Sequence, residues 1–139
     1  MGNSYPNGRT MQDTLKLLVT CGVLSALFAF GACGGGKAER TAAAMTGGYP
    51  SRGREKIRKY GCTSCHTIPG IPEADSLVGP PLNRIASRTY VGGVLTNTPD
   101  NMIRWIQNPQ GVDPLTAMPN LGVTEEDARD IAGYLYTLK

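Results

Sequence analysis

Two cysteines and a histidine stand close together at Cys62, Cys65 and His66, within the run Cys-Thr-Ser-Cys-His. This C-x-x-C-H spacing is the attachment sequence of c-type haem. Two thiols three positions apart can each add to one of two neighbouring vinyl groups on the haem edge, and the next residue can bring its imidazole to the iron. The motif therefore predicts one covalently bound haem c with His66 as an iron ligand.

Zinc binding and thiol redox chemistry are the competing interpretations of this motif. A structural zinc site needs four ligands of the Cys or His type. His66 is the only histidine of the chain, and the only other cysteines are Cys21 and Cys33. A thioredoxin-like C-x-x-C follows a strand in a βαβ unit, whereas this one follows a basic segment that looks helical. Haem attachment is therefore the stronger interpretation.

Two methionines downstream of the motif, Met102 and Met118, could supply the second iron ligand. Met102 lies in a segment that reads as a helix, because Thr98 can cap it and Pro109 follows its end. Met118 lies in the irregular segment 113–120, where a thioether can approach a metal without helical constraints. We favour Met118 as the ligand. The alternative is that Met118 only packs, which would leave the iron open or water-ligated.

Residues 1–32 read as an export segment or N-terminal anchor. Positive charges precede an apolar run over 17–32, and its length of about sixteen residues is shorter than the roughly 20 that a spanning helix needs. Cys33 follows this run, which resembles a bacterial lipobox, so we expect Cys33 to carry a lipid. Ordinary signal cleavage and an uncleaved anchor are the alternatives. Each predicts a periplasmic protein or one on the outer face of the cytoplasmic membrane.

Residues 33–49 are rich in Gly, Ala and Thr and contain few large apolar side chains. This composition predicts a flexible tether that leads to a domain over 50–139. Both phenylalanines of the chain lie in the export segment, so this domain contains none. A small domain without Phe needs another large apolar group at its centre, and a buried haem would supply it.

The net charge of +3 is modest and argues against nucleic acid as a partner. Basic side chains crowd residues 52–59, and acidic ones crowd 125–130. The simpler interpretation is two solvated helix faces. The other is a docking surface for an oppositely charged partner.

From about residue 50 to 139 the sequence resembles a class I cytochrome c domain. It is most similar to the cytochrome domain fused to subunit II of some bacterial heme-copper oxidases. The resemblance implies an all-α fold in which helices and long loops wrap one covalent haem. The matching segments, in order, are 61–68, 79–82, 96–99 with 105–106, 118–121 and a closing helix that contains 134–135.

The resemblance also implies roles for single residues. The backbone carbonyl of Pro80 would accept a hydrogen bond from the free N–H of His66, as metal-bound imidazoles generally require. Met118 would be the distal ligand. The first and last helices of the domain would cross, and the residues expected at the crossing are Gly53, Ile57, Ile131 and Tyr134.

Local signals add detail to this outline. Thr124 and Asp127 resemble a capping box at the start of the closing helix, which also carries an apolar stripe on one face. No strand signal is strong, although 89–95 could form a brief hairpin around Gly92 and Gly93. For the haem propionates we expect partners next to the pocket-forming loops, and the alternative is that the arginines are solvated and Trp105 only packs. The candidates are Arg84, Arg88, Tyr90 and Trp105.

These expectations favour a one-electron carrier that is not an enzyme. By resemblance, its partners are an oxidase or another respiratory complex. A five-coordinate haem that binds peroxide or a diatomic gas is the first alternative, but the chain has no second histidine for a distal catalytic role. An assembly lipoprotein with a structural haem is the second.

Overall fold

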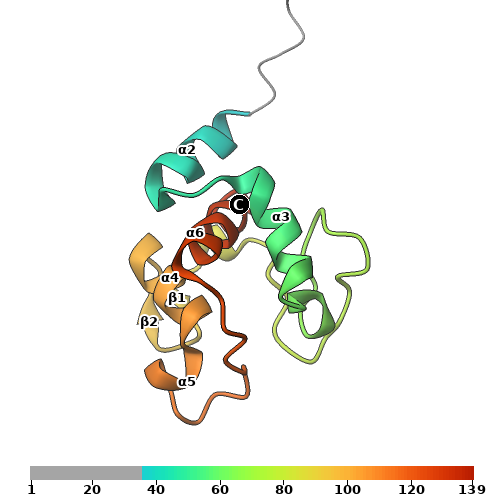
Figure 1. The fold of residues 1–139 in the computed structure, drawn as a ribbon, viewed down its shortest axis with the longest axis vertical. Coiled ribbons are helices and arrows are strands. Elements are labelled where there is room, and N and C mark those ends of the chain that lie inside the picture. Colours follow the sequence, from blue (N-terminus) through green and yellow to red (C-terminus); the bar gives the residue numbers. More distant parts are fainter. Residues whose placement is uncertain (1–35) are drawn as a thin grey trace, which may run out of the picture. The chain divides into compact units, whose positions relative to one another are not determined.

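The computed structural model describes residues 36–139. The predicted export segment and Cys33 lie outside these residues. Two strands of two residues each are the only strands described, so the expected all-α class is confirmed. In chain order (Figure 1), the elements are helices α2 (Lys37–Thr46) and α3 (Pro50–Lys59), 3-10 helices η1 (Cys62–Ser64) and η2 (Ile85–Ser87), strands β1 (Tyr90–Val91) and β2 (Leu95–Thr96), and helices α4 (Pro99–Gln107), α5 (Pro109–Val112) and α6 (Glu125–Leu135).

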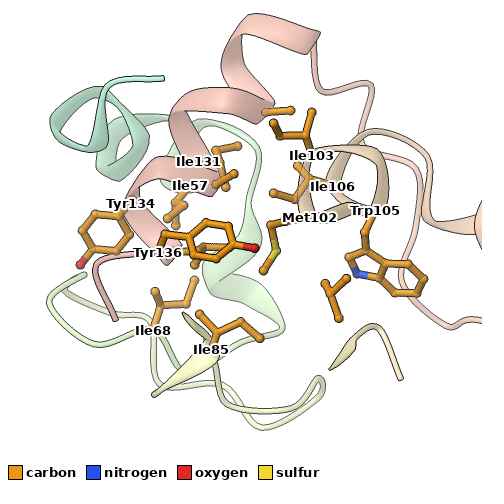
Figure 2. Packing of buried hydrophobic residues seen from close by; sticks show 14 of the residues in the cluster. Ile57, Ile68, Ile85, Met102, Ile103, Trp105, Ile106, Ile131, Tyr134 and Tyr136 are labelled. Atoms are coloured by element: carbon orange, nitrogen blue, oxygen red, sulfur yellow. The ribbon is translucent and has the colours of Figure 1, made fainter. Parts of the chain in front are cut away.

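Helices α3 and α6 cross and pack directly against each other, as the resemblance implied. A Cβ at Gly53 would run into the backbone of Asp130 and would lie 2.9 Å from the Cβ of Tyr134. Glycine therefore lets the two helix backbones approach at this point. Ile57 and Ile131 are both buried in the same cluster (Figure 2), and burial of each side chain contributes about 1.5–3 kcal/mol.

The charged side chains of α3 and α6 pair with each other. Arg52 Nε lies 2.8 Å from Asp130 Oδ2, and Lys56 Nζ lies 2.7 Å from Asp127 Oδ1. Lys59 Nζ lies 3.0 Å from the other oxygen of Asp127. Asp127 and Asp130 are buried, so neither a solvated face nor a docking surface describes them. They hold the two helices together.

The capping box predicted at the start of α6 forms only one of its two hydrogen bonds. The hydroxyl of Thr124 accepts a hydrogen bond of 3.2 Å from the backbone N of Asp127. The carboxylate of Asp127 accepts instead from Lys56, Lys59 and, at 2.8 Å, the hydroxyl of Tyr60. Hydrogen bonds from Lys56, Tyr60 and Lys59 hold the pKa of Asp127 well below its usual range.

The expectation of a flexible tether over 33–49 is wrong for Lys37–Thr46, which forms helix α2. Its glycines lie at the ends: Gly36 precedes the first turn, and Gly47 closes the last turn with a left-handed φ of 67°. The segment between them is rich in alanine, the best helix former. Ala42 and Thr46 are buried, and Nη1 of Arg129 in α6 donates to the Thr46 carbonyl at 3.3 Å. Packing against α6 therefore orders the segment.

Helix α4 begins and ends where the sequence predicts. Thr98 caps it by accepting a hydrogen bond of 3.3 Å from the backbone N of Asn101, and Asn108 ends it. The brief hairpin is also present, since β1 and β2 are antiparallel with Val91 opposite Leu95. Within residues 36–139, no helix is both long and apolar enough to cross a membrane.

Candidate functional site

The two motif cysteines lie just after α3, where the chain turns. Gly61 adopts a left-handed φ of 70° and leads into η1, which begins at Cys62. Cys62 and Cys65 are partly buried, and both line a cavity with His66. Burial raises the pKa of the Cys62 thiol to about 11, so it is protonated at neutral pH. The turn therefore places two thiols and one imidazole on the same cavity wall.

The imidazole of His66 is held by the loop that carries Pro80. Its Nδ1 lies 2.7 Å from the Pro80 carbonyl oxygen. A carbonyl oxygen can only accept, so Nδ1 carries the hydrogen and Nε2 keeps its lone pair for a metal. The backbone N of Gly79 also donates to the Cys65 carbonyl at 2.7 Å. These two bonds fix both the orientation and the tautomer of the imidazole.

Both candidate methionines reach the same cavity. Met118 is partly buried on the irregular segment between α5 and α6, and its backbone N donates to Thr116 Oγ1 at 3.2 Å. Met102 is 2% exposed within α4 and belongs to the buried cluster (Figure 2). The structure thus brings two thioethers to one site, one from a loop and one from a packed helix face.

The cavity has a volume of about 350 Å³ and mainly apolar walls. Trp105, 8% exposed, forms part of the wall. A Cβ at Gly92 would lie 2.6 Å from the Trp105 ring, so the hairpin backbone closes directly on the indole. Other apolar lining residues are Ile57, Ile68, Val78, Leu82, Ile85, Val91, Ile106, Leu121, Val123, Ile131 and Leu135.

Comparison with known proteins identifies the domain that carries this cavity. The family model described as cytochrome c matches residues 50–139, which include the thiols, the imidazole and both methionines. The chain belongs to the cytochrome c family. A c-type haem attached covalently is therefore the cofactor of this cytochrome, and haem-based electron transfer is its general function.

One curated relative of this cytochrome is the "Cytochrome c oxidase subunit 2" of Alkalihalophilus pseudofirmus. The two sequences are 30% identical over 90 residues, which are 64% of this chain and 25% of the relative. The cytochrome therefore spans about a quarter of the length of that relative. No solved structure matches the chain.

The donor set of the cavity fits a haem. Two thiols, one imidazole with a free Nε2 and walls of aliphatic side chains and one indole suit a flat, apolar macrocycle with a central iron. A metal ion without a macrocycle does not fit the described residues, because none of their His, Cys, Asp and Glu side chains form a cluster of three or more that could hold one. The structure thus gives no support to the zinc interpretation.

The structure brings Arg88, and not Arg84, to the cavity wall. Arg84 is exposed and has a left-handed φ of 54° just before η2, and its side chain is not among those that line the cavity. The guanidinium of Arg88 donates to the backbone carbonyls of Pro81 and, at 3.0 Å, Asn83. Trp105, Tyr90 and Arg88 therefore line the site and Arg84 does not.

Sequence reasoning assigned no role to the side chain of Asn97, which braces the wall behind Arg88. Its Nδ2 donates to the carbonyls of Ile85 and Arg88 at 2.8 and 2.9 Å. Its Oδ1 accepts a hydrogen bond of 2.8 Å from the hydroxyl of Tyr136. An asparagine just before a helix cap is an ordinary turn residue, so no local pattern pointed to a partner 39 residues further on.

Proposed function

We propose that this cytochrome is a one-electron carrier whose haem iron is ligated by His66 and Met118, and that it passes electrons toward a terminal oxidase of a respiratory chain. The observation that carries the proposal is the arrangement of these two side chains. His66, oriented by Pro80, and Met118, on an irregular loop, line the same apolar cavity. Neither needs a helix to distort in order to reach a central iron.

When bound, the haem supplies a reversible one-electron couple, and a thioether ligand raises its reduction potential. The chain's own residues perform the other tasks. Cys62 and Cys65 hold the macrocycle by its edge, and the Pro80 carbonyl keeps the His66 ring in one orientation. The apolar walls would keep water away from the bound group, and Trp105 and Arg88, which line the same cavity, could contact it.

Met118 is the better ligand candidate because Met102 is already used in packing. Met102 is 2% exposed among the side chains of α4 and its neighbours. Pulling its thioether out of that cluster would leave a cavity, at a cost of about 2–5 kcal/mol on the scale of core truncations. Met118 is only partly buried and precedes Pro119 on a loop, so it can move to the iron at lower cost.

Two observations favour the oxidase as acceptor and a place outside the cytoplasm. The curated relative is an oxidase subunit by name, and residues 1–32 have the sequence character of an export segment or anchor, with Cys33 as the expected lipid site. Together they favour a carrier held at the outer face of the cytoplasmic membrane that works by docking to a respiratory partner.

Optical spectra of the purified holo-protein test the ligand pair. With Met118 bound, the oxidised protein shows the weak near-infrared sulfur-to-iron band, and the reduced protein does not respond to carbon monoxide. Met118→Leu removes the band and admits carbon monoxide, whereas the matched variant Met102→Leu keeps the wild-type behaviour. If the wild-type protein lacks the band and binds carbon monoxide rapidly, it is a ligand-binding haem protein and not an electron carrier. Loss of the band in Met102→Leu alone would reassign the ligand.

Oxygen consumption tests the acceptor. We expect a purified heme-copper oxidase to consume oxygen when the reduced cytochrome is its only electron donor. Met118→Leu slows this reaction, because an iron without the axial thioether no longer keeps the same six ligands in both oxidation states and must rearrange on electron transfer. If the oxidase does not oxidise the wild-type reduced protein although ferricyanide does so readily, the protein is still an electron carrier but the oxidase is not its acceptor.

A further inference from the structure

Arg88 binds the loop that also holds the imidazole of His66. Its Nη2 donates to the backbone carbonyl of Pro81 and, at 3.0 Å, to that of Asn83. The carbonyl oxygen of Pro80, the residue before Pro81, lies 2.7 Å from His66 Nδ1. Arg88 and His66 therefore bind consecutive carbonyl oxygens of one loop.

The middle of this loop cannot donate hydrogen bonds of its own. Pro80 and Pro81 have no backbone N–H. The N–H groups of Gly79 and Leu82, on either side, donate to the backbone around His66 at 2.7 and 2.8 Å. Each proline ring fixes φ, so the direction of each carbonyl depends on the ψ angle of its own residue. The guanidinium fixes that angle at Pro81, and the peptide group next to it carries the oxygen that His66 binds.

The backbone of Arg88 is itself held in place, which brings the side chain to the loop. Asn97 Nδ2 donates to the carbonyls of Ile85 and Arg88 at 2.8 and 2.9 Å. The backbone N of Asn97 donates to the carbonyl of Thr89 at 2.9 Å. Arg88 is partly buried, whereas Arg84, on the same segment, is exposed and outside the cavity lining. The fold therefore delivers one of two neighbouring arginines to the loop.

We infer that Arg88 is a positioning residue for His66. Its guanidinium locks the loop, and the locked loop keeps the Pro80 carbonyl aligned with His66 Nδ1. The inference rests on the proposed function, in which His66 ligates the haem iron, and adds a residue that acts on this ligand through the loop. The bond to Pro80 keeps the hydrogen on Nδ1, leaves Nε2 free for the iron and raises the basicity of the imidazole. Without the lock, the Nδ1 proton is exposed to water more often.

Proton exchange at His66 Nδ1 tests the inference. Nuclear magnetic resonance follows this proton in the reduced, diamagnetic holo-protein and measures how fast it exchanges with water. The hydrogen bond to Pro80 protects the proton, so exchange in the wild type should be slow. Arg88→Met removes the guanidinium and keeps an unbranched apolar stem. We expect exchange at Nδ1 to become about tenfold faster in this variant, because the loop opens locally more often.

Two further variants separate the lock from the charge of Arg88. Arg84→Met is the matched control, and its exchange should equal that of the wild type. Equal acceleration in this control would refute the inference. Arg88→Lys keeps the charge, but its nitrogen lies one bond closer to Cα than Nη2 and is not part of a planar guanidinium. Exchange should be faster in this variant too, and acceleration in Arg88→Met alone would show that charge matters and the lock does not.

Two other results would overturn the inference. If Arg88→Met lowers the reduction potential but leaves exchange at Nδ1 unchanged, Arg88 acts on the haem by its charge and does not position His66. If the backbone amides of Ile57 and Ile131, in α3 and α6, exchange faster by the same factor as Nδ1, the substitution lowers the stability of the whole domain. Arg88 would then have a structural role only.

Failure of the proposed function gives a different result. A wild-type protein that lacks the near-infrared band and binds carbon monoxide has no bond from Met118 to the iron. Its carbon monoxide adduct is still diamagnetic, so exchange at His66 Nδ1 remains measurable. Slow exchange in that adduct, accelerated by Arg88→Met, would support the inference although the carrier proposal fails. Fast exchange in the wild type would refute the inference, because the Pro80 carbonyl would not be protecting the proton.

Discussion

Residue 79 has no room for a side chain, because the imidazole of His66 occupies the space. A Cβ on Gly79 would lie 2.5 Å from Cε1 and 2.8 Å from Nδ1 of the ring. The same backbone leads directly to Pro80, whose carbonyl oxygen holds Nδ1 at 2.7 Å. The glycine thus lets one loop both cover the imidazole face and fix its tautomer.

Gly79→Ala should therefore disturb the ligand and not only the fold. The added methyl group must push the ring or the loop away, which breaks the bond to Pro80, and we expect the free energy of unfolding to fall by about 1–3 kcal/mol, as for other overpacked sites. Because the imidazole N–H tunes the electron density at the iron, the reduction potential should also shift. Denaturant unfolding and redox titration measure the two effects.

Gly36→Ala is the matched control for this variant. A Cβ on Gly36 would meet no atom within 4 Å, and the φ of −57° at this residue is open to any side chain, so neither property should change. An unshifted potential in Gly79→Ala, together with an intact near-infrared band, would mean that the loop relaxes without moving the imidazole.

Tyr136→Phe should weaken the wall behind Arg88. The hydroxyl is the donor to Asn97 Oδ1, and burial raises the Tyr136 pKa to about 12, so it stays protonated and donating at any pH of interest. Its removal leaves a partly buried amide oxygen without this donor, at a cost of about 1–3 kcal/mol. Thermal unfolding measures the loss. Tyr49→Phe, at an exposed tyrosine, should change the melting temperature little, and equal effects of the two substitutions would contradict this account.

Much of the site could be predicted because its signals are local. The C-x-x-C-H motif identifies both thiols and His66 from spacing alone. The start of α4 follows from Thr98 as cap and Pro99 in the first turn. The Pro80 contact came from the resemblance and not from any local rule. These features depend on residues within one or two turns, or on a known family pattern.

The features that sequence reasoning missed all depend on long-range packing. Helix α2 looked like a tether because its alanines and threonines bury little surface, and packing, mainly against α6, orders it. Arg84 and Arg88 are the same residue type on one short segment, and the sequence does not show that only Arg88 lines the cavity. The pairing of Arg52 with Asp130 spans 78 positions, which no local pattern reveals.

Acid should destabilise the protein partly through Asp127. Its pKa is lower in the folded state than in the unfolded chain, where it is about 3.9. The stabilisation is therefore complete above the unfolded pKa and is lost as the pH falls below about 4 toward the folded pKa. Asp127→Asn should be less stable than the wild type at neutral pH and should lose less stability on acidification. The slope of its free energy of unfolding against pH should be smaller by an amount equivalent to at most one proton taken up on unfolding.

Urea unfolding followed by circular dichroism between about pH 7 and pH 2.5 measures this dependence. Glu55→Gln is the control, because Glu55 is an exposed carboxylate on the same helix, α3. It should keep the wild-type slope of stability against pH. The same slope in Asp127→Asn would show that other carboxylates account for the acid sensitivity.

Helix α2 should detach when its junction with α6 is obstructed. A Cβ at Gly48 would run into the backbone of Arg129 and lie 2.5 Å from the backbone N of Asp130. Gly48→Ala must therefore separate the chain from α6 here, at an overpacking cost of about 1–3 kcal/mol. Since α2 has only ten residues, it is too short to remain helical alone. Amide exchange over residues 37–46 should accelerate roughly ten- to a hundredfold, while the haem spectrum stays unchanged.

Hydrogen exchange read by mass spectrometry separates this local opening from global unfolding. Ser51→Ala, an exposed substitution on the neighbouring helix α3, should leave the exchange of α2 as in the wild type. If Gly48→Ala accelerates exchange in α3 and α6 as strongly as in α2, the helix is part of the same cooperative unit as the haem domain. If α2 keeps its protection, its order comes from Thr46 and Arg129 without the close approach at Gly48.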